Sequence, residues 1–129
     1  MNYLHVDAFD VAGAPSMFIA ELGLSNTDFA FANGTQSAFT GDAGWSLSLV
    51  SFSGASTAIN NLGPNGTSPW GMRGGISANA SYLWSAGAVA DHRYFTIAIN
   101  PTAVPEPASM VAMATGLAIL FKRKRARKN

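Results

Sequence analysis

The chain has 129 residues, enough for one small domain and a tail, and its formal net charge is +1. Six of the eight basic residues lie in the last eight positions, whereas residues 1–105 contain two basic and six acidic side chains and so carry a charge of −4. The body is acidic and does not have Lys and Arg side chains distributed over it, which argues against a nucleic-acid partner. The absence of cysteine excludes disulfides and thiolate metal sites.

Residues 1–100 are predicted to form a mainly β body, because short β-prone runs alternate with turn-rich segments. The first run, Tyr3–Val6, already has the character of a strand, and residues 17–22 fit a strand or a helical turn. Further strands are expected within residues 28–32, 45–52, 81–86 and 93–100.

Residues 93–100 give the clearest strand pattern. Apolar and more polar side chains alternate there, which assigns one set to each face: Phe95, Ile97 and Ile99 against Tyr94, Thr96 and Ala98. In residues 45–52 the alternation sets Trp45, Leu47 and Leu49 against Ser46 and Ser48, and the register is lost at Val50.

The number and spacing of these strands favour a small antiparallel β-sandwich or a jelly-roll-like body. A helix-rich body is the less favoured alternative. Residues 60–75 are rich in Gly, Pro and Asn, and we expect a long loop that acts as a disordered connector rather than as a functional site.

The body shows no catalytic or cofactor-binding motif. His5 and His92 are its only histidines, and their spacing fits no zinc site. A catalytic triad built on Asp91 and His92 is disfavoured, because adjacent residues of a strand point to opposite faces, and His92 is expected to be a polar residue at a strand edge. We therefore expect a protein without enzymatic activity, cofactor or metal.

Three weaker possibilities remain in the body. Asp7, Asp10 and Asp42 could ligate calcium, although solvated carboxylates are favoured because the calcium-loop pattern is absent. The glycosylation acceptor pattern occurs at Asn33, Asn65 and Asn79, where chance matches are expected.

Aromatic side chains could also form a sugar-binding platform, and the candidates are Trp45, Trp70, Trp84, Tyr82 and Tyr94. Core packing is favoured for Trp45 and Trp84. Trp70 follows a proline in the long loop, so it could be exposed and available to a ligand.

The C-terminal segment differs from the body. Residues 101–107 are expected to form a linker, and residues 108–121 are fourteen uncharged residues that would span about 21 Å as a helix, short of a hydrocarbon core of about 30 Å. We predict a marginal transmembrane helix, because its large apolar side chains favour insertion by about 2–3 kcal/mol and Ser109, Thr115 and Gly116 offset part of that. Its apolar positions are Ala108, Met110, Val111, Met113, Leu117, Ile119, Leu120 and Phe121.

A basic tail, residues 122–129, follows this apolar segment. Each cation near an anionic leaflet contributes about 1 kcal/mol, and positive charge favours the cytoplasmic side, so inner-membrane lipid is an expected partner and the body should lie outside. The cluster consists of Lys122, Arg123, Lys124, Arg125, Arg127 and Lys128.

Pro105, Glu106 and Pro107 precede the apolar segment. Each proline disfavours helix in the residue before it, so the triplet suits either recognition by another protein or a hinge. The order of Pro-Glu-Pro, apolar block and terminal basic cluster resembles the PEP-CTERM sorting signal, over about a fifth of the chain.

The resemblance implies a protein exported in Gram-negative bacteria, many of which produce exopolysaccharide, so exopolysaccharide is a further suggested partner. It also implies transient, single-pass residence in the inner membrane, processing by exosortase, and delivery to the cell surface. Residues 105–107 would then be the sorting motif, residues 108–121 the span and Lys122–Lys128 the retention cluster.

Proteins with this signal also carry an N-terminal signal peptide, and residues 1–15 have neither a basic region nor an apolar one. We therefore expect the natural chain to start further upstream. The alternatives are a permanent tail anchor, a fragment of a secreted hydrolase, and a nucleic-acid binder that uses the basic tail as an arm.

Overall fold

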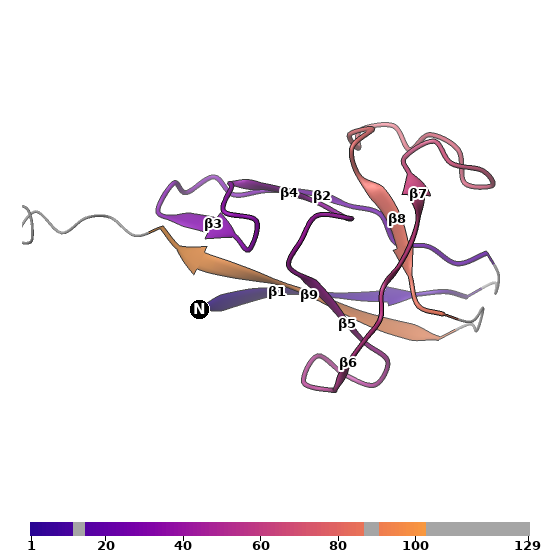
Figure 1. Cartoon of the computed structure of the whole chain (residues 1–129), viewed down its shortest axis with the longest axis horizontal. Coiled ribbons are helices and arrows are strands. Elements are labelled where there is room, and N and C mark those ends of the chain that lie inside the picture. Colours follow the sequence, from indigo (N-terminus) through magenta and orange to yellow (C-terminus); the bar gives the residue numbers. More distant parts are fainter. Residues whose placement is uncertain (12–14, 87–90, 103–129) are drawn as a thin grey trace, which may run out of the picture.

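The central strand of the fold is β9 (His92–Pro101), because three other strands pair with it in antiparallel orientation. In this computed structural model, residues 1–11, 15–86 and 91–102 are described. All eight residues of strand β1 (Asn2–Phe9) pair with one edge of β9 (Figure 1). The other edge is shared by β5 (Trp45–Ser48) and β3 (Phe29–Phe31), and β6 (Ser56–Thr57) extends the sheet beyond β5.

Two small sheets pack against this five-stranded sheet. One pairs β2 (Glu21–Gly23) with β4 (Ser37–Phe39), and the other pairs β7 (Asn60–Pro64) with β8 (Ser81–Trp84). Backbone hydrogen bonds connect them around Thr40, whose N–H donates to Ala20 O at 3.0 Å and whose carbonyl accepts from Ser81 N at 2.6 Å. The two small sheets therefore act as one layer over the larger sheet (Figure 1).

The core lies between these layers in two neighbouring clusters. Phe95 joins the larger sheet to Leu83 and Trp84 of β8, and Ile97 joins it to Ala38 of β4. Trp45 is partly buried against both clusters. Burial of such apolar side chains is the main favourable contribution to folding.

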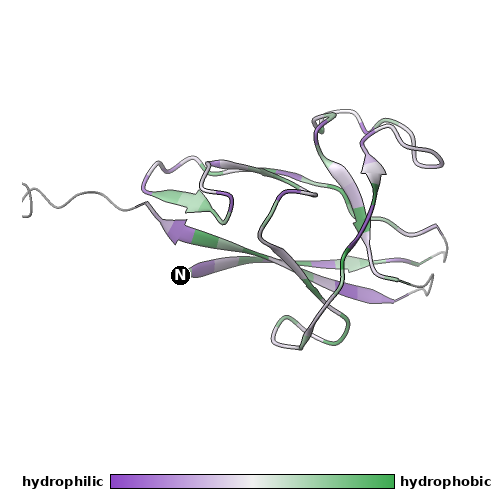
Figure 2. Cartoon of the chain, in the orientation of Figure 1, coloured by the Kyte–Doolittle hydropathy of each residue, from purple (hydrophilic) through white to green (hydrophobic). Residues whose placement is uncertain are grey.

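The predicted alternation in β9 is confirmed. Phe95 and Ile97 are fully buried, while Tyr94 and Thr96 on the opposite face are half-buried. The same alternation continues on β1, where Leu4, Val6 and Ala8 face inward, and it is visible as changing hydropathy along both strands (Figure 2). The larger sheet thus has one face in the core and one face toward solvent.

The mainly β, antiparallel body is confirmed, and the described residues contain no helix. Residues 17–22 are extended rather than helical, through a bridge between Phe18 and Leu83 and through β2. The choice between a sandwich and a jelly roll stays a prediction. The predicted C-terminal helix lies outside the described residues.

Two details of the sequence reading were wrong. Strand β5 ends at Ser48, so Leu49 leaves the alternation and is 45% exposed. The expected disordered loop at residues 60–75 begins as strand β7, because its first residues pair with β8. The rest of that loop is ordered by hydrogen bonds of the buried Asn65 side chain to Ile76 O and Arg73 N.

Gly44, in the turn before β5, has a φ of +99°, a region that strongly favours glycine, and a Cβ there would lie 2.3 Å from Ala32 Cβ. We expect Gly44→Ala to lower the free energy of unfolding by about 3 kcal/mol, through backbone strain and overpacking. Chemical denaturation followed by tryptophan fluorescence measures this change. Gly74→Ala is the matched control, since nothing lies within 4 Å of its Cβ position and its φ is not positive. Equal stability of the two variants would contradict the expectation.

Candidate functional site

The chain leaves the body from a fixed point at the end of β9. Pro101 is still paired with Phe29 of β3. Beyond it, the N–H of Thr102 donates to Asp28 O at 2.8 Å, and the hydroxyl of Thr102 donates to Thr27 O at 3.1 Å. The segment that follows Thr102 is therefore attached to the most extensively paired strand of the sheet, through a residue that is itself hydrogen bonded to the body.

The turn before β3 forms the surface beside this exit. Asn26, Thr27 and Asp28 are all exposed, and Asn26 Oδ1 accepts a hydrogen bond from Asp28 N at 2.8 Å, which fixes the turn. Two residues separate Thr102 from Pro105, so covalent geometry limits the reach from Thr102 to Pro105 to about 11 Å. A protein that binds residues 105–107 must approach this polar corner of the body.

The predicted sorting motif, membrane span and basic cluster, residues 105–128, lie outside the described residues. Within the part of the chain that the structure describes, no helix is long and apolar enough to cross a membrane. The predicted domain boundaries and the roles of the individual tail residues stay predictions.

Comparison with known families decides what the tail is. Residues 103–127 match the family model described as the PEP-CTERM protein-sorting motif. The chain carries a PEP-CTERM sorting motif. The match begins directly after Thr102 and contains Pro105, Glu106 and Pro107 together with all of the basic cluster except Lys128. No curated protein and no solved structure matches the chain.

The PEP-CTERM motif confirms the resemblance that the order of Pro-Glu-Pro, apolar block and basic cluster indicated. It marks the chain for export and sorting and implies recognition by exosortase. The match does not extend into the β body.

His92 does not form the Asp91-His92 pair that a triad would need. Its ring lies instead beside Asp7 of β1, with Nδ1 at 2.8 Å and 2.9 Å from the two carboxylate oxygens. Asp91 accepts from the backbone N–H of His92. Both His92 and Asp7 are about 40% exposed at their side chains, and no serine hydroxyl of the described residues is bonded to the His92 ring. The pair is a polar cross-strand contact at the start of β9.

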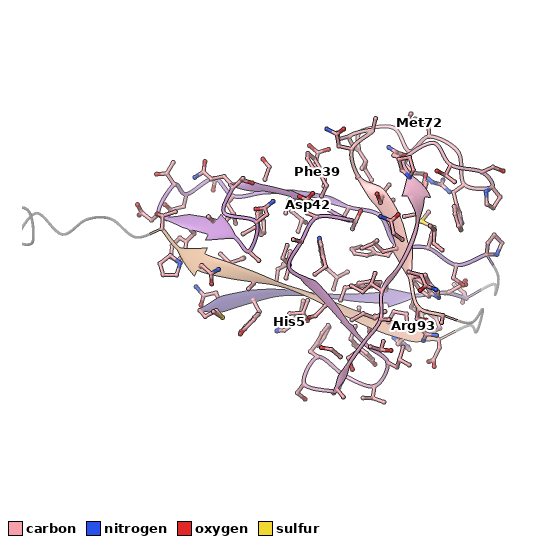
Figure 3. The ribbon with its side chains drawn as sticks, in the orientation of Figure 1. His5, Phe39, Asp42, Met72 and Arg93 are labelled. Atoms are coloured by element: carbon pink, nitrogen blue, oxygen red, sulfur yellow. The ribbon has the colours of Figure 1, made fainter. Side chains whose placement is uncertain are left out.

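The acidic residues considered for calcium are held in separate local contacts. Asp42 accepts hydrogen bonds from Phe39 N at 2.9 Å and from Asn33 Nδ2 at 3.1 Å, and Figure 3 shows Asp42 beside Phe39. Asp10 accepts from the hydroxyl of Ser16. The described residues contain no group of three or more His, Asp or Glu side chains that could hold a metal ion.

Asn65 organises the loop between β7 and β8. It is only 5% exposed, and its side-chain amide donates to the carbonyls of Arg73, Ile76 and Ser77. Its Oδ1 accepts from Arg73 N at 2.7 Å and from the Tyr82 hydroxyl at 3.2 Å. These contacts make Asn65 a structural residue with no free amide for a glycan.

Of the two other asparagines that match the glycosylation acceptor pattern, Asn79 is exposed and Asn33 is half-buried.

Trp70 packs inside the same loop rather than facing a ligand. Its ring centroid lies 5.0 Å from that of Tyr82, and its Nε1 donates to Pro15 O at 3.1 Å. Tyr82 is fully buried, as is nearly all of Trp84. Trp45 donates from Nε1 to Phe39 O at 2.9 Å and packs against the core. The core packing expected of Trp45 and Trp84 is confirmed, and Trp70 is half-buried within the loop rather than exposed.

A different set of rings lines the solvent face of the larger sheet. The centroids of consecutive rings lie 4.3–6.0 Å apart. Tyr3, Phe9 and Phe52 are each more than 40% exposed. We call this set the outer aromatic row, and its members are Tyr3, His5, Phe52, Tyr94, His92 and Phe9.

Sequence reasoning did not find this row as a group. The alternation along β1 places Tyr3, His5 and Phe9 on one face, but nothing local shows that β1 pairs with β9. That pairing joins residues about ninety positions apart in the sequence and sets Phe9 opposite His92. Only the folded sheet brings the rings together.

Proposed function

We propose that this protein is an exported surface or matrix protein whose β body is displayed by means of its PEP-CTERM segment, and that it acts without catalysis. The observation that carries the proposal is the sorting-motif match over residues 103–127, which starts where β9 leaves the body. Thr102 still belongs to the hydrogen-bonded body, so an enzyme can act on the following segment without unfolding the sheet.

In this proposal each part of the segment has one task. Pro105, Glu106 and Pro107 are read by exosortase, since prolines disfavour regular structure and leave backbone groups open to a partner. Residues 108–121 cross the inner membrane only transiently, in keeping with their marginal length. Lys122–Lys128 stay in the cytoplasm, attracted by anionic lipid, until the tail is removed.

The body is the part that is delivered. Its surface carries few charges, with two basic and six acidic residues before position 106. Exopolysaccharide is a proposed partner at the surface, where the outer aromatic row offers rings that could contact sugar.

A permanent tail anchor is the second candidate function, because the same marginal span and basic cluster would hold an uncut chain at the membrane. A fragment of a secreted hydrolase is the third.

The test is to express the full chain in its own host with Pro105, Glu106 and Pro107 intact or all replaced by Ala. We expect the intact protein to lose its basic tail, seen by intact mass, and to leave the inner membrane. The triple variant should accumulate uncut in the inner-membrane fraction, with at least a tenfold fall in the processed form.

Thr102→Ala is the matched control, because it removes only a hydroxyl hydrogen bond on the body side of the junction. It should be processed normally. If the wild-type chain also remains full length and membrane-bound, the tail is a permanent anchor and the sorting proposal fails.

A further inference from the structure

Strand β1 forms an open edge of the five-stranded sheet. It pairs with β9 on one side, and within residues 1–11, 15–86 and 91–102 no strand pairs with its other side. The opposite edge of the sheet is formed by two short strands, β6 with two residues and β3 with three. The backbone N–H and C=O groups that alternate along the free edge of β1 can therefore bind another strand.

Natural edge strands are usually protected against such pairing, and β1 has little protection. Protective features include proline, lysine or another charged side chain, a β-bulge or very short length, and β1 has one charged side chain, Asp7. Strand β1 has eight residues, Asn2–Phe9, contains neither proline nor lysine, and pairs with β9 without a break in register. Figure 1 shows it as one of the longest strands, beside β9. A long, regular edge with so little protection is suited to a strand of matching pattern.

The two faces of β1 restrict what can pair with it. Leu4, Val6 and Ala8 face the core, while the odd-numbered residues face solvent. Residues directly opposite one another in an antiparallel pair lie on the same face. A second β1 in antiparallel orientation satisfies this condition only when each pair combines two odd or two even positions.

Among these registers, the one centred on Val6 is self-complementary. It sets Val6 against Val6 of the second copy and Leu4 against Ala8, which keeps apolar residues on the core side. On the solvent side it sets His5 against Asp7 and Tyr3 against Phe9. The His5–Asp7 pair joins a ring N–H donor to a carboxylate acceptor, and hydrogen-bonded and aromatic cross-strand pairs stabilise a sheet.

The neighbouring registers lack this complementarity. Centring the pair on His5 sets the two histidines against each other and Tyr3 against Asp7. Centring it on Asp7 sets two carboxylates against each other, which is destabilising. Hydrogen-bond and aromatic complementarity on the solvent face therefore favours a second β1 as the partner and the register centred on Val6.

The side chains needed for the pairing remain able to form it. His5 uses Nδ1 to contact Thr96 Oγ1 at 2.9 Å, and no partner of its Nε2 lies among the described residues. Asp7 contacts His92, but a carboxylate has about four lone-pair sites and can accept a further donor. Tyr3 and Phe9 are 53% and 55% exposed, so both rings are open to a second copy.

We propose that two copies of this chain associate through antiparallel pairing of β1 with β1, in the register centred on Val6, to form one continuous sheet. The outer aromatic row then extends across the junction, because Tyr3 of each copy adjoins Phe9 of the other. The association does not depend on how the tail is processed.

Disulfide formation tests the register directly, since the 129-residue sequence has no cysteine. In the full chain in mild detergent, the double variant Tyr3→Cys/Phe9→Cys should give a covalent dimer under mild oxidation. Opposite residues have Cα atoms about 4.5–5.5 Å apart, within the range of a disulfide. Within one strand the two positions are about 20 Å apart, so they cannot join within a single chain.

The single variants Tyr3→Cys and Phe9→Cys are the controls for collision and for association through the tail. In the proposed register each introduced thiol lies about 20 Å from its equivalent in the second copy, so each single variant should give at least tenfold less dimer. Equal cross-linking of single and double variants, or none in the double variant, overturns the proposal. Both positions are exposed, and an unchanged unfolding transition will show that the fold is intact.

A charge exchange gives a second, independent readout by sedimentation equilibrium of the full chain. His5→Asp places like charges at both symmetric contacts and should raise the dimer dissociation constant on the order of tenfold. Adding Asp7→Lys should restore dimerisation. Asp28→Lys, at an exposed site outside β1, should leave the dimer dissociation constant unchanged. No response to His5→Asp, or no recovery in the double variant, overturns the register.

Discussion

Replacing Asn65 with Ala should lower the free energy of unfolding by about 3 kcal/mol, because a buried side chain with several hydrogen bonds is removed and its partners are left unpaired. The amide of Asn65 donates to three carbonyls of residues 73–77, and its oxygen accepts from Arg73 N and from the hydroxyl of Tyr82. The loss is a large part of the 5–15 kcal/mol typical of a domain.

The effect should be local at first. The loop of residues 65–77 also positions Trp70 over Tyr82, so loss of Asn65 should change the tryptophan fluorescence before the main transition. Chemical denaturation followed by fluorescence and by circular dichroism separates the two events.

Two variants control this experiment. Asn79→Ala removes an exposed asparagine that also matches the glycosylation acceptor pattern, and it should lower the free energy of unfolding by less than about 0.5 kcal/mol. Asn65→Asp keeps the shape and the acceptor oxygen but places a carboxylate against three carbonyls, so it should destabilise at least as much as Ala. A mild effect of Asn65→Asp would show that the donated hydrogen bonds contribute little.

Arg93→Ala is the second substitution with a large expected effect, about 3 kcal/mol, since it leaves a cavity and an unpaired hydroxyl in the core. Arg93 is 3% exposed and lies on the inner face of β9. Its Nε donates to Ser85 Oγ at 2.6 Å, its Nη1 donates to His92 O at 2.8 Å, and its guanidinium lies 5.5 Å from the Trp84 ring centroid. Figure 3 shows it near one end of the larger sheet.

Comparison with Arg93→Met separates packing from charge. Met keeps most of the volume beside Trp84 but no charge, and exchange of a buried charge for an apolar group is often nearly neutral, so we expect a loss of about 1 kcal/mol. Thermal unfolding of the three proteins measures the difference. If Met and Ala cost the same, the polar contacts rather than the packing hold the two layers together.

Asp91→Ala serves as the control for the ion pair. Asp91 Oδ2 is 3.7 Å from Arg93 Nη1, but the Asp91 side chain is 60% exposed. Exposed pairs contribute about 0–1 kcal/mol, so this variant should remain close to wild type. A loss as large as that of Arg93→Ala would assign the stabilising role to the ion pair.

The sequence by itself determined the two properties that depend on local order. The sorting motif is a linear pattern in which Pro105–Pro107, an apolar block and the basic cluster follow one another, and a partner reads it in that order, so the linear sequence was sufficient to find it. The β class followed from the period-two alternation of Phe95, Ile97 and their neighbours, because strand side chains point alternately to opposite faces.

Tertiary structure decided everything that depends on contacts between distant residues. Asn65 has an ordinary loop sequence, and only folding shows that its amide binds carbonyls 8–12 positions away. The residues next to Trp70 in the sequence suggest an exposed side chain, but in the fold its Nε1 donates to Pro15 O and its ring packs against Tyr82. Only the sheet topology shows that, among the described residues, β1 pairs on one side alone, with β9. Strand order is set by burial and backbone pairing across the whole chain, and no local pattern contains that information.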